Sequence, residues 1–297
     1  MTRLPIIDTH VHFWNRRNPD PGLKWVWIAD DVDHPIIGNI DAIKMLSYEV
    51  DAYYSESRFA DVAGFVHVQA AIGSEDPVLE TKWLHRMRQD APLPFSIVGD
   101  VDLGRDDASE MIARQCEASP HFVGLRDFTL EPALAAKETT DRREKSLADM
   151  AARGLVLDMD CEWQNMAEAR KLADRHPELP VVLEHIGFPR QRDDEYYGNW
   201  LGGLQELAKA PNVTCKISGL AMTDPRFTPA SLARWIDACL DTFGPDNCII
   251  GSNWPVDRLY SSYDPIMNIY RDHVSRFDEA DQRKILSENA QRLYRVL

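Results

Sequence analysis

The chain has 297 residues, a formal net charge of −15 and 44% hydrophobic residues. Its length suits one large α/β domain, and the hydrophobic share is ordinary for a globular protein with a full core. The excess of acidic side chains argues against nucleic-acid and membrane partners, because it repels phosphate backbones and anionic lipid. We therefore expect a small-molecule substrate. An anionic substrate would need a local arginine or lysine at its site.

Cysteine usage and the predicted first strand indicate a cytoplasmic protein. The five cysteines are widely spaced and form no CxxC pair, which favours reduced thiols over a disulfide framework. A strand predicted from residue 4 leaves no room for a signal peptide, and no apolar run approaches the roughly 18–20 residues of a membrane helix. The acidic surface does not forbid a homodimer.

Short β-branched runs alternate along the chain with longer amphipathic stretches, the pattern of βα units around a parallel sheet. Strands are predicted at 4–10, 63–68, 95–100, 122–126, 155–160, 181–185, 213–217 and 247–251. Helices are predicted at 41–57, 78–89, 107–118, 144–153, 166–176, 199–209 and 229–243, with a last helix at 278–296. This strict alternation predicts a single-domain (β/α)8 TIM barrel over residues 1–297. An open doubly wound sheet is the alternative.

The segment after the first predicted strand, residues 13–39, is unusually long and carries Trp14, Trp25 and Trp27. The loops that follow barrel strands form the catalytic face, and a long structured loop there is usually a lid or a substrate wall. The alternative is that the tryptophans only plug the mouth of the barrel.

The first predicted strand ends in the run Asp8-Thr9-His10-Val11-His12. Residues i and i+2 of a strand point to the same face, so His10 and His12 are expected to project together. Two adjacent imidazoles suit a metal ion or a hydrogen-bonding clamp on a substrate oxygen. The end of a barrel strand is where such a site is expected.

The sixth and eighth predicted strands bring further polar residues to the same end of the barrel. His185 is expected to face the cavity beside the histidine pair, whereas Glu184 is expected to point away and to be structural. Asn253 and Asp257 follow the eighth strand, which adjoins the first strand in a closed barrel. Asp257 is the nearest ionisable candidate for a general base, with a loop or helix-capping carboxylate as the alternative.

Six motifs, in this order, resemble the amidohydrolase superfamily over essentially the whole chain. They are Asp8-Thr9-His10-Val11-His12-Phe13-Trp14, Val66-His67-Val68-Gln69-Ala70, Gly124-Leu125-Arg126, Glu184-His185-Ile186-Gly187, Lys216-Ile217-Ser218-Gly219-Leu220 and Gly251-Ser252-Asn253-Trp254-Pro255. The similar branch is amidohydrolase-2, which includes sugar-lactone hydrolases, 2-pyrone-4,6-dicarboxylate lactonase and 4-sulfomuconolactone hydrolase.

The resemblance implies metal ligands at His10, His12 and His185. It implies at most one divalent ion, with zinc favoured, and some relatives use none. Asn253 stands where many family members have an aspartate that acts as base on the attacking water, and an amide cannot accept that proton. Asn253 would then position water and substrate, leaving Asp257 and His185 as candidate bases.

The resemblance also implies a binding role for Arg126, similar to family arginines that bind substrate carboxylates. A guanidinium grips a carboxylate with two parallel hydrogen bonds, although Arg126 would alternatively pair with a neighbouring aspartate. Lys216 is expected to bind an anionic group or to pair with a carboxylate. Trp163 and Trp254 are expected to line the pocket.

The fifth predicted strand ends at Asp160, Glu162 and Trp163. These residues are candidates to line the pocket, but core or rim positions are favoured for them. The function implied is hydrolysis of a small, carboxylate-bearing lactone by an activated water. Two alternatives stay open. One is a metal-dependent decarboxylase of an aromatic or unsaturated carboxylic acid. The other is a binding barrel without catalytic activity.

Overall fold

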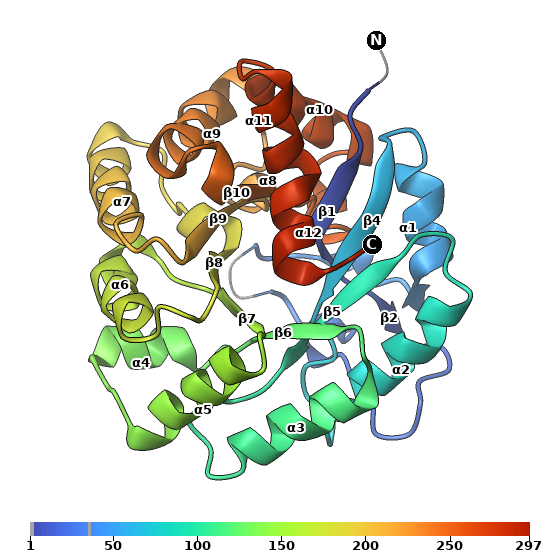
Figure 1. The fold of residues 1–297 in the computed structure, drawn as a ribbon. Helices are drawn as coiled ribbons and strands as arrows, with labels where there is room; N and C mark the ends of the chain where they lie inside the picture. The colour runs from blue at the N-terminus through green and yellow to red at the C-terminus, as the bar shows by residue number, and fades with distance from the viewer. Residues whose placement is uncertain (1–2, 35–36) are drawn as a thin grey trace.

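The fold is seen in a computed structural model, which describes residues 3–34 and 37–297. Eight parallel strands form one sheet, and each pairs with the next along the chain. They are β1 (Ile6–Val11), β4 (Val62–Val68), β5 (Phe95–Asp100), β6 (Phe122–Arg126), β7 (Val156–Met159), β8 (Val181–Leu183), β9 (Val213–Ile217) and β10 (Cys248–Ile250). Figure 1 shows the strands at the centre of the molecule with helices around them.

The sheet closes on itself where β1 meets the segment that follows β10. A parallel bridge joins Val11 to Trp254, and the Trp254 carbonyl accepts a 2.8 Å hydrogen bond from the His12 amide. Thr9 Oγ1 also donates to the Ile250 carbonyl at 2.7 Å. The predicted (β/α)8 barrel is therefore confirmed, and the open doubly wound sheet was wrong, because the first and last strands are joined.

Helices alternate with the strands on the outside of the barrel (Figure 1). The main ones are α1 (Val50–Ser57), α2 (Val78–Gln89), α3 (Ala108–Ala118), α4 (Leu130–Ala136), α5 (Asp141–Ala152), α6 (Met166–Arg175), α7 (Asp194–Leu207), α9 (Pro229–Phe243) and α10 (Tyr263–Val274), with a single turn at α8 (Leu220–Thr223). The bounds predicted for α2 and α9 are confirmed at both ends. Helices α4, α8 and α10 were not predicted from the sequence.

The helix predicted at 41–57 was wrong in its first half. A short 3-10 turn, Asp41–Ile43, is followed by strand β3 (Ser47–Tyr48), and only α1 is helical. β3 pairs antiparallel with β2 (Trp14–Asn15) from the long first loop. This long-range pairing overrides the local helical pattern, which only reports which residues are apolar.

The C-terminal residues form the predicted last helix, built from α11 (Glu279–Arg283), a π turn (Lys284–Glu288) and α12 (Asn289–Tyr294). Ala290, Leu293 and Tyr294 share a buried cluster with valines and isoleucines on the inner faces of the strands. The last helix thus covers the end of the barrel where the strands begin, which leaves the other end for the site.

The tryptophans of the long first loop divide between the two roles considered from the sequence, packing into the core and forming a wall of the cavity. Trp14 and Trp25 are buried and pack into the main core. Trp27 is half-buried, and its Nε1 donates a 2.8 Å hydrogen bond to the Ala70 carbonyl. Residues 35–36 of this loop lie outside the described part of the chain.

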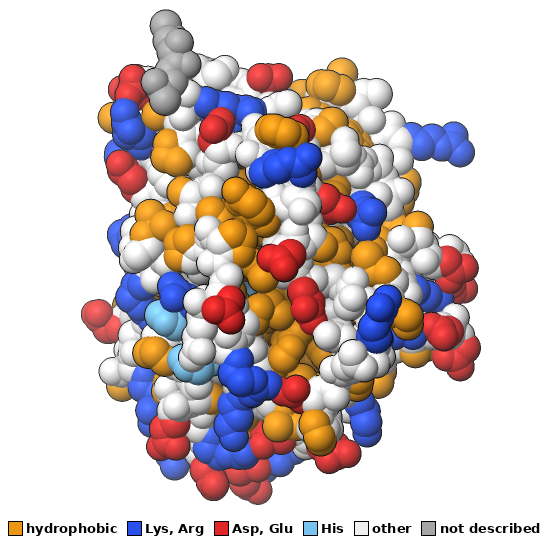
Figure 2. Space-filling view, turned by 90° about the vertical axis from the view of Figure 1, so that its right-hand side faces the viewer, with side chains coloured by type: hydrophobic (Ala, Val, Ile, Leu, Met, Phe, Trp, Pro, Cys, Tyr) orange, Lys and Arg blue, Asp and Glu red, His pale blue; other side chains and the backbone are white. Residues whose placement is uncertain are grey.

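Charged side chains of both signs are interspersed on the face that Figure 2 shows. Ion pairs such as Arg170 with Glu206 recur on the surface, so the net acidity is partly offset locally. In the described ranges, no helix combines the length and apolarity needed to span a bilayer.

Candidate active site

A cavity of about 300 Å³ opens at the end of the barrel where the strands finish. His12, His185, Asn253, Arg126 and Asp160 contribute to its lining. A larger and more open groove of about 1010 Å³ runs between residues 3–5 and helices α10 and α11, but it holds none of the predicted site residues. The chemistry therefore belongs to the smaller cavity.

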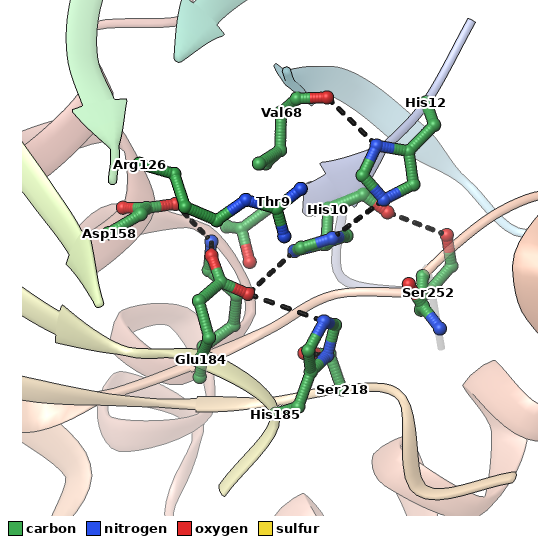
Figure 3. Close-up of polar contacts among 12 residues, drawn as sticks. Thr9, His10, His12, Val68, Arg126, Asp158, Glu184, His185, Ser218 and Ser252 are labelled. Atoms are coloured by element: carbon green, nitrogen blue, oxygen red, sulfur yellow. Dashed lines mark hydrogen bonds and ion pairs between the residues drawn. The ribbon is translucent and has the colours of Figure 1, made fainter. Parts of the chain in front are cut away.

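His10 of β1 and His12, just beyond the end of that strand, point to one spot, as the sequence predicts. His10 Nε2 and His12 Nε2 lie 3.0 Å apart, and His12 Nδ1 lies 2.8 Å from the Val68 carbonyl oxygen (Figure 3). A carbonyl can only accept, so His12 Nδ1 carries the proton and His12 Nε2 presents a lone pair. This backbone contact fixes both the ring orientation and the tautomer of His12.

His185 joins this pair from a bend rather than from a strand. β8 ends at Leu183, and His185 and Ile186 have left-handed φ angles of 50° and 52°. The ring of His185 lies 4.3 Å from that of His10, centroid to centroid, and its Nδ1 is 2.8 Å from Ser218 Oγ. The predicted position of His185 on the sixth strand was wrong, although its ring does reach the site.

The same bend corrects the expectation for Glu184. Alternation along a strand does not apply beyond Leu183, so Glu184 and His185 both turn toward the site. Glu184 Oε2 lies 2.8 Å from His10 Nδ1 and 3.5 Å from His185 Nε2 (Figure 3). The clue in the sequence was the acidic residue directly before a site histidine, which period-two counting hides.

Lys216 lies inside the barrel and does not line the cavity. Its Nζ donates to Asp158 Oδ2 at 2.6 Å and to Glu184 Oε1 at 2.8 Å, and all three side chains are fully buried. Pairing with carboxylates, the alternative kept for Lys216, describes these contacts, and contact with an anionic substrate is not supported. Tyr294 of α12 completes the chain by donating to Asp158 Oδ1 at 2.6 Å.

Burial keeps the site imidazoles neutral. Burial lowers the pKa of His10 to about 4 despite the opposing effect of Glu184, and it lowers the pKa of His12 and His185 well below the usual value. Burial alone would raise the pKa of Glu184, but His10 and Lys216 outweigh it and hold that pKa well below its usual range. At neutral pH the cluster is three neutral rings and one carboxylate.

Asn253 lines the cavity, with Asp257 behind it. Asn253 has a left-handed φ of 58°, and its Nδ2 donates a 2.8 Å hydrogen bond to Asp257 Oδ1. Asp257 is fully buried and is not among the residues that line the cavity. Desolvation raises the pKa of Asp257 to about 7, against the hydrogen bond from Asn253. Asp257 therefore supports Asn253, and no cavity-facing surface of Asp257 is seen.

The cavity wall opposite Asn253 carries polar side-chain atoms without a hydrogen-bond partner. Among the described residues, Arg126 Nε, both amide atoms of Gln69 and both carboxylate oxygens of Asp160 are buried without a hydrogen-bond partner. Arg126 Nη2 donates to the Gln69 carbonyl at 3.0 Å, and its guanidinium lies 4.6 Å from the centre of the Phe128 ring. The described part of the chain gives Arg126 no ion pair, so the aspartate pairing considered from the sequence is not seen.

The two predicted tryptophans lie outside the cavity lining. Trp254 is buried, with its Nε1 donating to Glu56 Oε2 at 2.5 Å and its ring 5.4 Å from that of Tyr263. Trp163 is half-buried with its edge against Tyr196. Both expectations of pocket lining were wrong, because each indole faces a neighbouring helix or loop. Trp27 and Phe128 supply aromatic walls instead.

The donor set fits a divalent metal ion of the kind bound by imidazole and carboxylate. Ligand atoms of His10, Glu184 and His185 lie within 4.8 Å of one another. His10 Nδ1 and Glu184 Oε2 are buried without an aligned hydrogen bond despite their short separation. His12 meets a further requirement of such sites, a ligand imidazole whose other nitrogen bonds a backbone carbonyl.

A TIM barrel with clustered imidazoles at the strand ends defines a class of barrel enzymes whose catalytic groups follow the strands. A family model described as Amidohydrolase (Amidohydro_2) matches residues 7–296, and the chain belongs to this family. The resemblance drawn from the six motifs is therefore confirmed.

Three relatives indicate which part of this family the chain is similar to. L-fucono-1,5-lactonase of Burkholderia multivorans is 28% identical, over 97% of this chain and 95% of that protein. L-rhamnono-gamma-lactonase of Scheffersomyces stipitis is 21% identical, over all of both chains. A crystal structure of a Burkholderia multivorans amidohydrolase with bound zinc superposes with a TM-score of 0.80, at 25% identity, over 99% of this chain and 100% of that one.

Proposed function

We propose that this protein opens a small lactone ring by adding water to its carbonyl carbon. One observation carries the proposal: the imidazoles of His10, His12 and His185 and the Glu184 carboxylate converge at the end of the barrel, beside a cavity that Arg126 also lines. The two related lactonases support the reaction class. A lactone ring is a compact electrophile, which suits a cavity of about 300 Å³.

We further propose that the site uses one divalent ion, most simply zinc, held by His10, His12 and His185. When bound, such an ion polarises a carbonyl and lowers the pKa of a bound water to about 7. The protein's part is to keep the three rings neutral and oriented, through the Val68 carbonyl for His12 and the Ser218 hydroxyl for His185. Glu184 adds a negative charge beside them.

The proposed substrate carries a carboxylate, and Arg126 supports this choice. The guanidinium is buried at the wall of the cavity, has no ion pair among the described residues and is free to make a bidentate contact. A substrate carboxylate would give this buried guanidinium a direct ionic partner. The amide of Asn253, on the opposite side, is oriented by Asp257 and would hydrogen-bond the substrate or the attacking water.

Two properties expected from the sequence stay proposals. They are a cytoplasmic location and assembly as a homodimer. Metal-dependent decarboxylation of an aromatic or unsaturated acid stays the alternative reaction, and the activity test below is designed to separate it from lactone hydrolysis.

A titration assay tests the proposed reaction. Protein purified without chelator is analysed for metal and then incubated with a panel of neutral and carboxylate-bearing lactones, with and without added zinc. Ring opening releases one acid group per turnover, which a pH-stat counts. We expect turnover that is faster on carboxylate-bearing lactones and lost in His10→Ala. No hydrolysis across the panel, with carbon dioxide released from aromatic acids, would instead establish the decarboxylase.

A further inference from the structure

Hydrolysis of a lactone needs a group that takes a proton from the attacking water and returns one to the ring oxygen. Three residues near the cavity are candidates for this transfer: His185, Asp257 and Asp160. They differ in whether they reach the cavity and in whether their polar atoms are already engaged.

His185 and Asp257 are both engaged elsewhere. His185 Nδ1 bonds Ser218 Oγ at 2.8 Å, and its Nε2 faces Glu184 within the proposed metal site. Asp257 Oδ1 accepts the hydrogen bond of Asn253 and its Oδ2 has no hydrogen-bond partner among the described residues, but the side chain is fully buried and does not line the cavity. A general base must come within hydrogen-bond reach of the water it activates, so neither residue meets the geometric requirement in this arrangement.

Asp160 meets it. It follows β7 and lines the cavity together with His12, His185 and Arg126. Both of its carboxylate oxygens are buried without a hydrogen-bond partner among the described residues, and no ion pair involves them. A buried carboxylate with no donor is rare unless a ligand or a reaction uses it, because desolvation of the charged form is costly.

The end of β7 at Met159 explains how Asp160 comes to lie there. Asp158, two residues earlier, points into the barrel and binds Lys216. Asp160 is the first residue after the strand, and it lies among the residues that line the cavity. The Asp158 carboxylate is structural and paired, whereas the Asp160 carboxylate is buried at the cavity wall without a hydrogen-bond partner among the described residues.

Resting on the proposed lactone hydrolysis, we propose that Asp160 is the proton-transfer residue of this active site, in place of the amide at Asn253. The Asp160 carboxylate takes a proton from water as the water oxygen bonds to the carbonyl carbon, and the carbonyl π electrons move to its oxygen. When these electrons return, the ring C–O bond breaks and the ring oxygen takes the proton from Asp160. Water is consumed, one hydroxy acid is formed, and the carboxylate is regenerated.

The surroundings of Asp160 suit this role. Burial raises the pKa of Asp160 to about 7, with Arg126 opposing the shift and the carboxylates Glu184 and Glu131 adding to it. Lys216, on β9, opposes it from inside the barrel. A base whose pKa lies near the working pH both accepts and returns a proton efficiently. These facing groups come from β6, from α4, from β9 and from the turn after β8.

The test compares wild type, Asp160→Asn and Asp160→Glu on the panel lactone that wild type hydrolyses fastest. Rates are measured from pH 5 to pH 8.5 and corrected for spontaneous opening. We expect Asp160→Asn to lower kcat by about 10²–10⁴-fold with little change in KM, and to abolish the fall in kcat/KM below pH 7. Asp160→Glu keeps a carboxylate and should retain that acidic limb with an intermediate kcat.

Asp257→Asn is the matched control. It also removes a buried carboxylate whose burial raises its pKa to about 7, but one outside the cavity, so the acidic limb should persist in this variant. Thermal unfolding verifies that each variant is folded, and if Asp160→Asn does not fold, loss of the acidic limb in Asp160→Glu decides against the proposal. An Asp160→Asn protein with unchanged kcat and an unchanged limb, or with only a raised KM, overturns it. An inactive wild type would instead refute lactone hydrolysis itself.

Discussion

Asn253 Nδ2 donates a 2.8 Å hydrogen bond to Oδ1 of Asp257, a carboxylate with no exposure to solvent. The buried carboxylate of Asp257 needs a hydrogen-bond donor beside it, and the side-chain amide of Asn253 supplies that donor. A carboxylate at 253 would face a second carboxylate in a buried place, where the two cannot both be charged at low cost.

This relationship predicts the outcome of Asn253→Asp. We expect the variant to lose about 1–3 kcal/mol of unfolding free energy, because a donor is replaced by an acceptor beside Asp257. The loss should grow from pH 5 to pH 8, since deprotonation adds the second charge. Urea unfolding at both pH values measures it. The exchanged double variant Asn253→Asp with Asp257→Asn restores one donor and one acceptor, and failure of that exchange to recover stability would contradict the explanation.

Replacing Lys216 is expected to lower the unfolding free energy more than Asn253→Asp does. Lys216→Met leaves Asp158 and Glu184 buried without their shared cation, and breaking a buried ion pair in this way costs about 3–5 kcal/mol. Lys209→Met is the matched control, because Lys209 is exposed and pairs with Glu206 three residues earlier. The control should change stability by about 0.5 kcal/mol or less. Equal midpoints for the two variants in urea unfolding would show that the buried pairing contributes little.

Tyr294 links the last helix to the site. Its hydroxyl donates to Asp158 Oδ1 at 2.6 Å, and Asp158 binds the lysine that contacts Glu184. Tyr294→Phe should cost about 1–3 kcal/mol, because a buried carboxylate oxygen loses its donor. Tyr54→Phe, at an exposed position on α1, should change stability by about 0.5 kcal/mol or less. Calorimetric melting temperatures of the two variants provide the comparison.

Protonation of His67 is expected to account for part of the loss of folding stability at acidic pH. Burial, with His10 and Arg126 adding to it, lowers the pKa of His67 to about 3, and Nε2 accepts a 3.0 Å hydrogen bond from the Phe13 amide. The unfolded chain titrates near 6.5 and so takes up the proton first as the pH falls. Stability from the neutral ring is complete above pH 6.5 and is lost as the pH falls from 6.5 toward 3.

His67→Gln keeps an acceptor for Phe13 but removes this titration. Between pH 6.5 and pH 4, the unfolding free energy of wild type should fall more steeply than that of the variant, by about 1.4 kcal/mol per pH unit for one proton. Urea unfolding at several pH values checks this. Parallel curves for the two proteins would mean that His67 stays neutral in both states or binds its proton without unfolding.

The sequence by itself determined the barrel, because alternating apolar periods report which face of each element is buried. The HxH spacing also predicted that His10 and His12 converge, although His12 lies just beyond the end of β1. The residue at which each strand ends could not be predicted from this periodicity. The left-handed turn at His185 and Ile186 aims Glu184 at His10, and no local pattern announced that turn.

Only the tertiary structure decided which charged groups are already paired. Lys216, Asp158 and Glu184 lie 26 or more residues apart in sequence, and their pairing inside the barrel removes the lysine from the substrate's reach. Asp160 and Arg126 remain unpaired at the cavity wall. The free energy of a buried charge depends on its nearest charged partners. The fold decides which residues become those partners, because strand order and burial set the distances between them.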